Sequence, residues 1–177
     1  MYLDTFRTAT TSDAQSIAKL VNWAYRPEPG AIGWTHESAL VSGNRINATQ
    51  VMAVMARPCS VILLGLKDSE IVACVHAEKD GGNSQIGMLA VHPSLQGVGI
   101  GKQMLAHAES HAMEIFGAEK FTMLVVCGRS ELVAYYLRRG YQKTDTILNY
   151  PVAANVGVPK DPNLKIEVLE KWAKVDA

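Results

Sequence analysis

The chain has 177 residues, and its 17 Lys plus Arg balance its 17 Asp plus Glu, so it lacks the basic excess typical of a nucleic-acid-binding protein. A composition of 48% hydrophobic and 19% charged residues excludes a disordered chain, and the length predicts one domain over residues 1–177. No apolar run approaches the ~20 residues of a membrane span, and the 3 widely spaced cysteines form no disulfide framework, so we expect a cytoplasmic protein without membrane or nucleic-acid partners.

The beginning of the chain predicts a strand and a helix. Tyr2–Arg7 alternates weakly between apolar and polar residues before a Thr-rich stretch. Ser12 with Gln15 matches a capping box, and the apolar residues that follow recur at helical spacing. We expect this helix to end near Arg26, with a loop over Pro27–Gly33.

A second helix and a group of strands follow. Asn47 with Gln50 repeats the capping signature and opens the helix. Ser60–Leu66 and Glu70–Ala77 are short runs rich in branched residues, which predicts an antiparallel hairpin. A Gly-Gly turn then leads into a third strand, Gln85–Val91, so three consecutive strands form a meander.

The second half of the chain alternates between helix and strand. The predicted elements are a helix from Ile100 to Ile115, a strand Phe121–Cys127, a helix Glu131–Arg139, and strands Tyr141–Tyr150 and Lys165–Trp172, with a surface loop over Asn149–Leu164. This order predicts an α/β fold with a mixed sheet of about seven strands, antiparallel at first and parallel across the helix that starts at Gly99.

The most informative segment is the glycine-dense turn Gln96–Lys102 between a strand and the strongest helix. Glycines permit positive φ, so successive N–H groups converge, and the helix start adds free donors. Such a turn suits a diphosphate. Two familiar phosphate loops do not fit, because the dinucleotide fingerprint needs a glycine at Lys102, and the Walker loop needs a glycine at Gln96 and a hydroxyl at Gln103. A helix cap without a ligand is the alternative.

The flanking sequence resembles the GNAT superfamily of N-acetyltransferases. Its acetyl-CoA motif is matched by Gln96, Gly99 and Gly101, and Tyr136–Tyr141 is similar to its second signature. The resemblance covers nearly the whole chain and implies a single GNAT-like domain. It implies that the main chain of Gln96, Gly97, Val98, Gly99, Ile100, Gly101 and Lys102 binds the CoA pyrophosphate. It also implies that Leu89, Ala90 and Val91 pair with pantetheine, which requires the strand Phe121–Cys127 to splay away.

The same resemblance implies acetyl transfer from acetyl-CoA to a primary amine by direct attack in a ternary complex, without a metal. Tyr136 is then the proton donor to the CoA sulfur, with Tyr135 as a competitor for that role. A tyrosine is a reasonable acid for a thiolate and acts only while it is protonated. A free backbone N–H near Val91 could face the thioester carbonyl.

The general base stays open. Some family members use a glutamate at the position of Gln85, and a glutamine cannot accept a proton at neutral pH. His76 and Glu78 lie two apart on one strand and share a face, so they are candidates for binding or deprotonating the amine. Glu37, in the loop on the acceptor side, is a third candidate.

Two histidines one helical turn apart raise the question of a metal. His107 and His111 lie four residues apart, as the histidines of HExxH do, but Glu109 stands two residues after the first histidine instead of one. We therefore expect a solvated helix face and no metal site.

Three functions remain to be compared. The balanced charge favours a small-molecule amine as the acceptor. A peptide or protein N-acetyltransferase would have an open groove between Trp34 and the loop Pro151–Pro162. A non-catalytic CoA-binding sensor would keep the glycine loop without turnover. The sequence leaves the acceptor, the acyl chain and the oligomeric state open, and a homodimer is one state that it allows.

Overall fold

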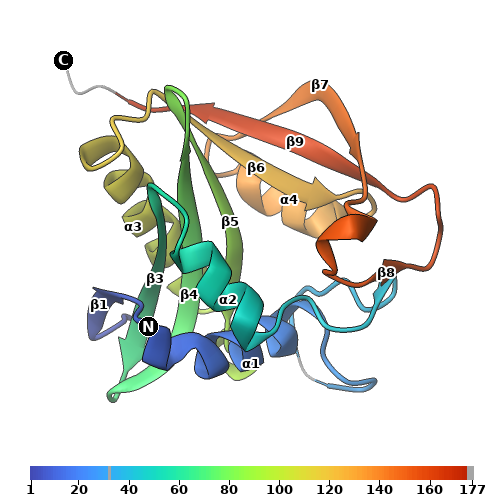
Figure 1. The fold of residues 1–177 in the computed structure, drawn as a ribbon, viewed down its shortest axis with the longest axis horizontal. Helices are drawn as coiled ribbons and strands as arrows, with labels where there is room; N and C mark the ends of the chain where they lie inside the picture. Colours follow the sequence, from blue (N-terminus) through green and yellow to red (C-terminus); the bar gives the residue numbers. More distant parts are fainter. Residues whose placement is uncertain (32, 175–177) are drawn as a thin grey trace.

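A mixed seven-stranded sheet with the order β1-β3-β4-β5-β6-β9-β7 lies at the centre of the fold (Figure 1). The computed structural model describes residues 1–31 and 33–174. The strands are β1 Thr5–Thr8, β2 Val41–Ser42, β3 Ser60–Lys67, β4 Glu70–Asp80, β5 Asn83–Val91, β6 Lys120–Val126, β7 Gln142–Asn149, β8 Val158–Pro159 and β9 Lys165–Trp172. The helices are α1 Ala14–Tyr25, α2 Ala48–Met55, α3 Ile100–Glu114 and α4 Ser130–Leu137. The predicted α/β fold and its single mixed sheet are confirmed.

The helices cover both faces of the sheet. Helices α3 and α4 pack on one face, over a core that includes Val75, Met104 and Tyr136. Helices α1 and α2 pack on the other face, where Ile17 and Cys74 are buried. Because successive residues of a strand point to opposite faces, the apolar run of β4 feeds both cores at once. The strand is therefore apolar throughout its middle, as the sequence indicated.

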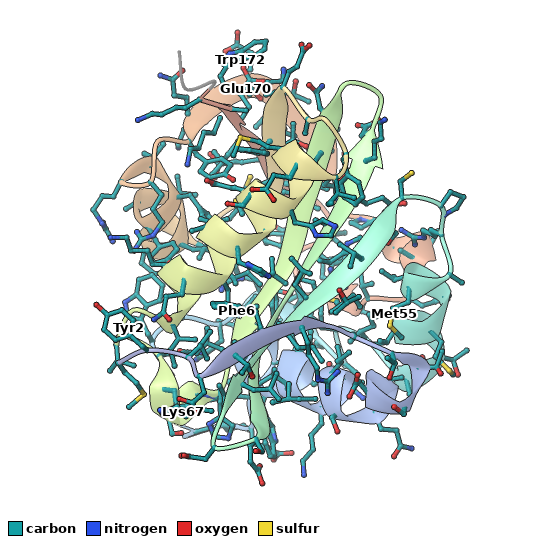
Figure 2. The ribbon with its side chains drawn as sticks, turned by 90° about the vertical axis from the view of Figure 1, so that its left-hand side faces the viewer. Tyr2, Phe6, Met55, Lys67, Glu170 and Trp172 are labelled. Atoms are coloured by element: carbon teal, nitrogen blue, oxygen red, sulfur yellow. The ribbon has the colours of Figure 1, made fainter. Side chains whose placement is uncertain are left out.

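The N-terminal edge of the sheet is β1. It pairs antiparallel with β3, and the ring of Phe6 lies 4.4 Å from the ring of His107 on α3, centroid to centroid. Figure 2 shows Phe6 on this edge strand, to the right of Tyr2 and above Lys67. His111 likewise packs edge-on against Phe116 at 5.1 Å. Both histidines are half-buried against aromatic rings, so the expectation of a solvated face was wrong.

The start of α1 differs from the prediction. The capping box uses Thr10 and Asp13, whose carboxylate accepts a hydrogen bond from the Thr10 backbone N–H at 2.8 Å. A short 3₁₀ turn over Thr11–Asp13 precedes the helix, so Ser12 lies inside that turn. Arg7 also donates two hydrogen bonds to the Asp13 carboxylate, at 2.8 and 2.9 Å, and this ion pair supports the turn. The contact is between β1 and the helix start, which local spacing does not reveal.

The C-terminal strands depart from simple sequence order. Strand β9 inserts between β6 and β7 and pairs antiparallel with both. The predicted loop Asn149–Leu164 contains β8, which pairs with β2 in a two-stranded sheet. The loop predicted over Pro27–Gly33 is confirmed for its described residues, and residue 32 lies outside them. No helix of the described residues is long and apolar enough to cross a membrane.

Strands β5 and β6 diverge, and this feature positions the site. They pair in parallel only over Asn83–Gln85 and Lys120–Thr122, among the residues that the structure describes. Beyond that point the two strands separate (Figure 1). The predicted splay of the strand ending at Val91 from its parallel neighbour is therefore confirmed. A bulge at Met88, with φ 50°, bends β5 at the start of the opening.

Candidate functional site

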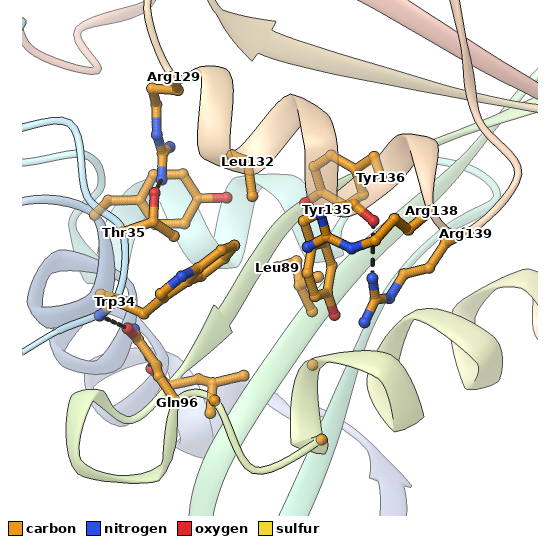
Figure 3. Close-up of a pocket in the computed structure, with 16 residues that line it drawn as sticks. Trp34, Thr35, Leu89, Gln96, Arg129, Leu132, Tyr135, Tyr136, Arg138 and Arg139 are labelled. Carbon is orange, nitrogen blue, oxygen red and sulfur yellow. Dashed lines mark hydrogen bonds between the residues drawn. The ribbon is translucent and has the colours of Figure 1, made fainter.

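The main cleft has a volume of about 390 Å³ and lies where β5 ends, between the glycine loop and α4 (Figure 3). We call it the main cleft. It is lined by Ala24, Tyr25, Trp34, Thr35, Leu89, Val91, Gln96, Gly97, Gly99, Gly101, Arg129, Leu132, Tyr135, Tyr136, Arg138 and Arg139. They come from the end of α1, the loop after it, β5, the glycine loop and α4. Segments far apart in the sequence thus meet at the opening of the sheet.

The glycine loop Gln96–Lys102 presents free amides to the main cleft. Gly99 is the N-cap of α3 and has φ 93°, a left-handed conformation that favours glycine. The backbone N–H groups from Gly97 to Lys102 make no hydrogen bond within the part of the chain that the structure describes. Free amides at the positive end of a helix dipole form a site for an anion such as a diphosphate.

Gly101 permits a close approach between the glycine loop and α4. A Cβ at this position would lie 2.9 Å from the Tyr135 hydroxyl and 3.8 Å from a methyl group of Val91. The Tyr135 ring in turn lies under the Arg139 guanidinium, at 3.4 Å from its centroid. Glycine at 101 therefore lets a tyrosine close one side of the cleft.

Gln96 connects three segments of the site. Its side-chain oxygen accepts a hydrogen bond from the Trp34 backbone N–H at 2.6 Å, and its Nε2 donates to the Val91 carbonyl at 3.2 Å. Figure 3 shows this side chain below the Trp34 ring. Gln96 thus fixes the glycine loop to the end of β5 and to the loop after α1.

Tyr136 lies at the inner end of the main cleft, on α4. It is 5% exposed, and its ring packs edge-on against Tyr135 and Tyr141 at 5.4 and 5.8 Å. Its hydroxyl makes no hydrogen bond within the described residues. Burial raises the pKa of Tyr136 well above its ordinary value, so the phenol is protonated at neutral pH.

A second, smaller cavity of about 140 Å³ opens on the other side of Tyr136, in the gap between β5 and β6. We call it the notch. It is lined by Tyr25, Glu37, Arg45, Gln85, Ile86, Gly87, Met88, Met123, Leu124, Val125, Val126, Arg129, Leu132, Tyr136, Tyr150, Pro151, Val156 and Ile166. Tyr25, Arg129, Leu132 and Tyr136 line both the main cleft and the notch. These four side chains form the boundary between the two cavities.

Glu37 is buried beside the notch within a cluster of arginines. Its carboxylate accepts hydrogen bonds from Arg26 at 2.6 and 3.0 Å and from Arg129 at 3.4 Å. Arg26 also donates to the Tyr150 hydroxyl and the Val156 carbonyl. Buried charges need such partners, because an unpaired one is costly. The cluster fastens the loop after β7 to the end of α1.

The predicted cofactor-binding residues divide into two groups. Leu89, Val91, Gln96, Gly97, Gly99 and Gly101 line the main cleft, as does Tyr136. Ala90 and Ile100 are each 1% exposed, with side chains in the core, and Val98 is 42% exposed. Lys102 lines a different pocket, of about 830 Å³, with Glu109, Arg138 and Lys171. These four residues do not line the main cleft, and the role expected of them is one for the main chain.

The three candidates for amine binding also divide. Glu37 lines the notch, whereas His76 and Glu78 line neither cavity. His76 shares a hydrogen bond with Ser60 at 2.8 Å, and Glu78 pairs with Arg57 at 3.1 Å. Burial lowers the pKa of His76 to about 4. The structure therefore does not bring His76 and Glu78 to the site.

Several residues at the site carried no sequence signal. Tyr25, Arg45 and Tyr150 line the notch from three separate segments, and the spacing between them has no period. Arg129, Arg138 and Arg139 form a small basic group in the sequence around the second signature, and the structure brings all three to the main cleft. No group of three or more His, Cys, Asp or Glu that could hold a metal occurs in the described ranges, 1–31 and 33–174.

The protein has an α/β fold in which two parallel strands of a mixed sheet separate, and the main cleft lies at this opening beside the glycine loop. The model of the acetyltransferase (GNAT) family matches residues 17–141. The chain belongs to the acetyltransferase (GNAT) family, as its resemblance implied. A search of curated proteins finds no match.

Solved structures of this family share the fold over nearly the whole chain. A GNAT family acetyltransferase from Elizabethkingia anophelis with acetyl-CoA bound has a TM-score of 0.68 at 17% identity, covering 96% of this chain and 97% of that one. A ribosomal-protein-alanine N-acetyltransferase from Brucella melitensis has a TM-score of 0.67 at 15% identity, covering 96% of this chain and 99% of that one. The yncA protein from Salmonella typhimurium with its cofactor acetyl-CoA has a TM-score of 0.68 at 15% identity, covering 98% of this chain and 95% of that one. At these identities the likeness concerns the fold alone.

Proposed function

We propose that this protein transfers an acetyl group from acetyl-CoA to an amine, by direct attack of the amine in a ternary complex. The observation that carries the proposal is the position of Tyr136, which lines both the main cleft and the notch. A hydroxyl at that boundary can serve a reaction between a donor held in the cleft and an acceptor held in the notch. Acetyl-CoA accompanies two of the structural neighbours, those from Elizabethkingia anophelis and Salmonella typhimurium, and this supports the choice of donor.

The glycine loop is suited to the diphosphate of CoA. Its free amides, from Gly97 to Lys102, supply donors that no group of the described chain uses. Arg138 and Arg139 line the same cleft and add positive charge. The backbone edge of β5 beyond Gln85 has no strand partner on the β6 side in the described part of the sheet, so Leu89 to Val91 can pair with pantetheine.

The chemistry requires three tasks besides binding. When bound, acetyl-CoA supplies a thioester; the amine nitrogen bonds to its carbonyl carbon, and the C–S bond breaks. We assign the proton that the departing sulfur gains to Tyr136, because burial keeps this phenol protonated. We assign stabilisation of the carbonyl oxygen to a backbone N–H near Val91, where β5 has left its neighbour. The amine loses one proton, which balances the one gained by sulfur.

The notch favours a small acceptor over a peptide. Tyr150, Pro151 and Val156 line it from the loop after β7, and Arg26 donates hydrogen bonds to Tyr150 and Val156 of that loop. Gln50 on α2 adds hydrogen bonds to the Ala154 and Asn155 carbonyls, at 3.2 and 3.1 Å. The open groove expected of a peptide acetyltransferase would need this loop to be free. The acceptor is therefore proposed to be a small-molecule amine.

The test combines binding and turnover. Calorimetry with acetyl-CoA should give heat of binding, and a screen of amines should release free CoA thiol with an acetylated product detected by mass spectrometry. Heat without thiol release from any amine would favour a sensor over an enzyme. No heat at all with a folded sample would overturn the proposal.

A further inference from the structure

The charged residues that line the notch are two arginines and one glutamate, among those that the structure describes. Arg45 and Arg129 hold their guanidinium groups near the Tyr25 ring, at 5.8 and 5.6 Å from its centroid. Glu37 is the single acidic residue of this described lining. The notch therefore has more positive than negative charge.

Glu37 is already paired with two arginines, so its charge is largely compensated before any ligand binds. One of its oxygens accepts two short hydrogen bonds from Arg26, and the other accepts from Arg129 at 3.4 Å. Arg26 and Glu37 have side chains that are each 4% exposed, so this ion pair is buried. The charge of Glu37 is thus compensated from outside the notch by Arg26.

Arg129 is incompletely paired. The residue is 6% exposed, and its guanidinium donates to the neutral Thr35 hydroxyl at 3.1 Å besides its long contact with Glu37. Its Nε–H is buried and has no acceptor in the described chain. Buried polar groups are nearly always hydrogen-bonded, and an arginine binds carboxylates through two parallel N–H groups. Arg129 therefore lacks an oxygen acceptor at the boundary of the two cavities.

We infer that the acceptor carries a carboxylate close to its amine, and that Arg129, assisted by Arg45, binds this carboxylate in the notch. The inference rests on the proposed function and names the substrate class of the same site: amino acids, rather than polyamines or amines without an acid group. A polyamine would bring further positive charge to a lining that already has two guanidinium groups. A carboxylate would complete the pairing of Arg129.

The same arrangement helps the reaction. A bound amine must be neutral to attack, and nearby guanidinium groups disfavour its ammonium form. The carboxylate would therefore anchor the substrate while the arginines lower the pKa of its amine. This reduces the need for a strong general base at Gln85, where the side chain cannot serve as one.

The experiment compares each acceptor with its own amide. Thiol release from acetyl-CoA is measured with a set of free α- and ω-amino acids, the amide of each, and spermidine. At least one free acid should be acetylated, with kcat/KM roughly 10- to 100-fold above its amide, because a charge-assisted hydrogen bond to a buried group contributes that much. Arg129→Gln and, more mildly, Arg45→Gln should reduce this ratio of acid to amide.

The ratio separates recognition from a structural role. A variant that only loosened the fold would slow the acid and its amide equally. Lys143→Gln on β7 removes one positive charge outside both cavities and should leave the ratio unchanged. Equal rates for acid and amide, faster turnover of spermidine, or no turnover of any free acid would overturn the inference. If Arg129→Gln instead weakened acetyl-CoA binding by calorimetry and left the ratio intact, Arg129 would serve the donor.

These outcomes differ from those that test the proposed function. Acetylation of amines without a carboxylate would leave acetyl transfer intact while refuting the recognition by Arg129. Absence of acetyl-CoA binding in a folded sample would refute both. If Arg129→Gln fails to fold, Arg45→Gln gives the same comparison, because Arg45 is half-buried and its guanidinium makes no hydrogen bond in the described chain.

Discussion

Tyr136→Phe tests the proposed acid by removing one oxygen atom. The phenyl ring keeps its contacts with Tyr135 and Tyr141, at 5.4 and 5.8 Å. The hydroxyl has no hydrogen-bond partner in the described chain, so its loss leaves no buried donor or acceptor unpaired. We expect the free energy of unfolding to change by less than about 1 kcal/mol.

The expected effect on turnover is much larger. A positioned general acid contributes about 10²- to 10⁴-fold to the rate, equivalent to about 3–5 kcal/mol of activation free energy. The glycine loop is untouched by the substitution, so the dissociation constant of acetyl-CoA should stay the same. We therefore expect kcat to fall by at least about 10²-fold while cofactor binding is unchanged.

The assay is thiol release under saturating acetyl-CoA, with calorimetry on the same sample. Tyr135→Phe is the matched control, because it makes the same chemical change one residue away, and Tyr135 lines the main cleft but not the notch. Full activity of Tyr136→Phe would refute the assignment. Loss of activity in Tyr135→Phe alone would transfer the role of acid to that residue.

Three further predictions concern the loop and two titrating groups. Gly99→Val puts a branched side chain on a backbone with φ 93°, at a cost of roughly 1–2 kcal/mol, so acetyl-CoA should bind about 10-fold more weakly by calorimetry; unchanged affinity would count against the glycine loop. Burial lowers the pKa of His76 to about 4, so stability should fall as the pH drops from about 6.5 towards 4, and His76→Gln should remove that slope in urea titrations. The Arg7 guanidinium lowers the pKa of Asp13 to about 2, so the stability it confers is present above about pH 3.8 and lost as the pH falls towards 2; Asp13→Asn should show no such loss.

The order of helices and strands could be predicted because each segment has a clear period or stop signal. The helix after Gly99 and the meander before it follow from such local patterns. The opening between β5 and β6 was available only through the family resemblance. Nothing in Phe121–Cys127, a plain apolar run, indicates that it pairs with its neighbour over three residues at one end.

The candidate site could be predicted in part. Residues of the glycine loop stand together in the sequence, so their spacing identified them. Arg26, Glu37 and Arg129 meet through the fold, since Glu37 is separated from its two partners by 11 and 92 positions along the chain. A buried ion cluster of this kind has no sequence period, and its members look like ordinary surface charges. The bulge at Met88 was missed for a related reason, since any residue can occupy it at some cost.

The short seam between β5 and β6 has a mechanical consequence. The sheet consists of two parts: one contains β1, β3, β4 and β5, and the other contains β6, β9 and β7. Only three residue pairs join the two parts in the described sheet. A molecule that binds between β5 and β6 would add hydrogen bonds between the two parts that the protein does not make itself. Ligand binding should therefore raise the unfolding temperature and also increase the protection of β5 and β6 amides from hydrogen exchange. The unfolding temperature thus reports how much of the protein has ligand bound between the two strands.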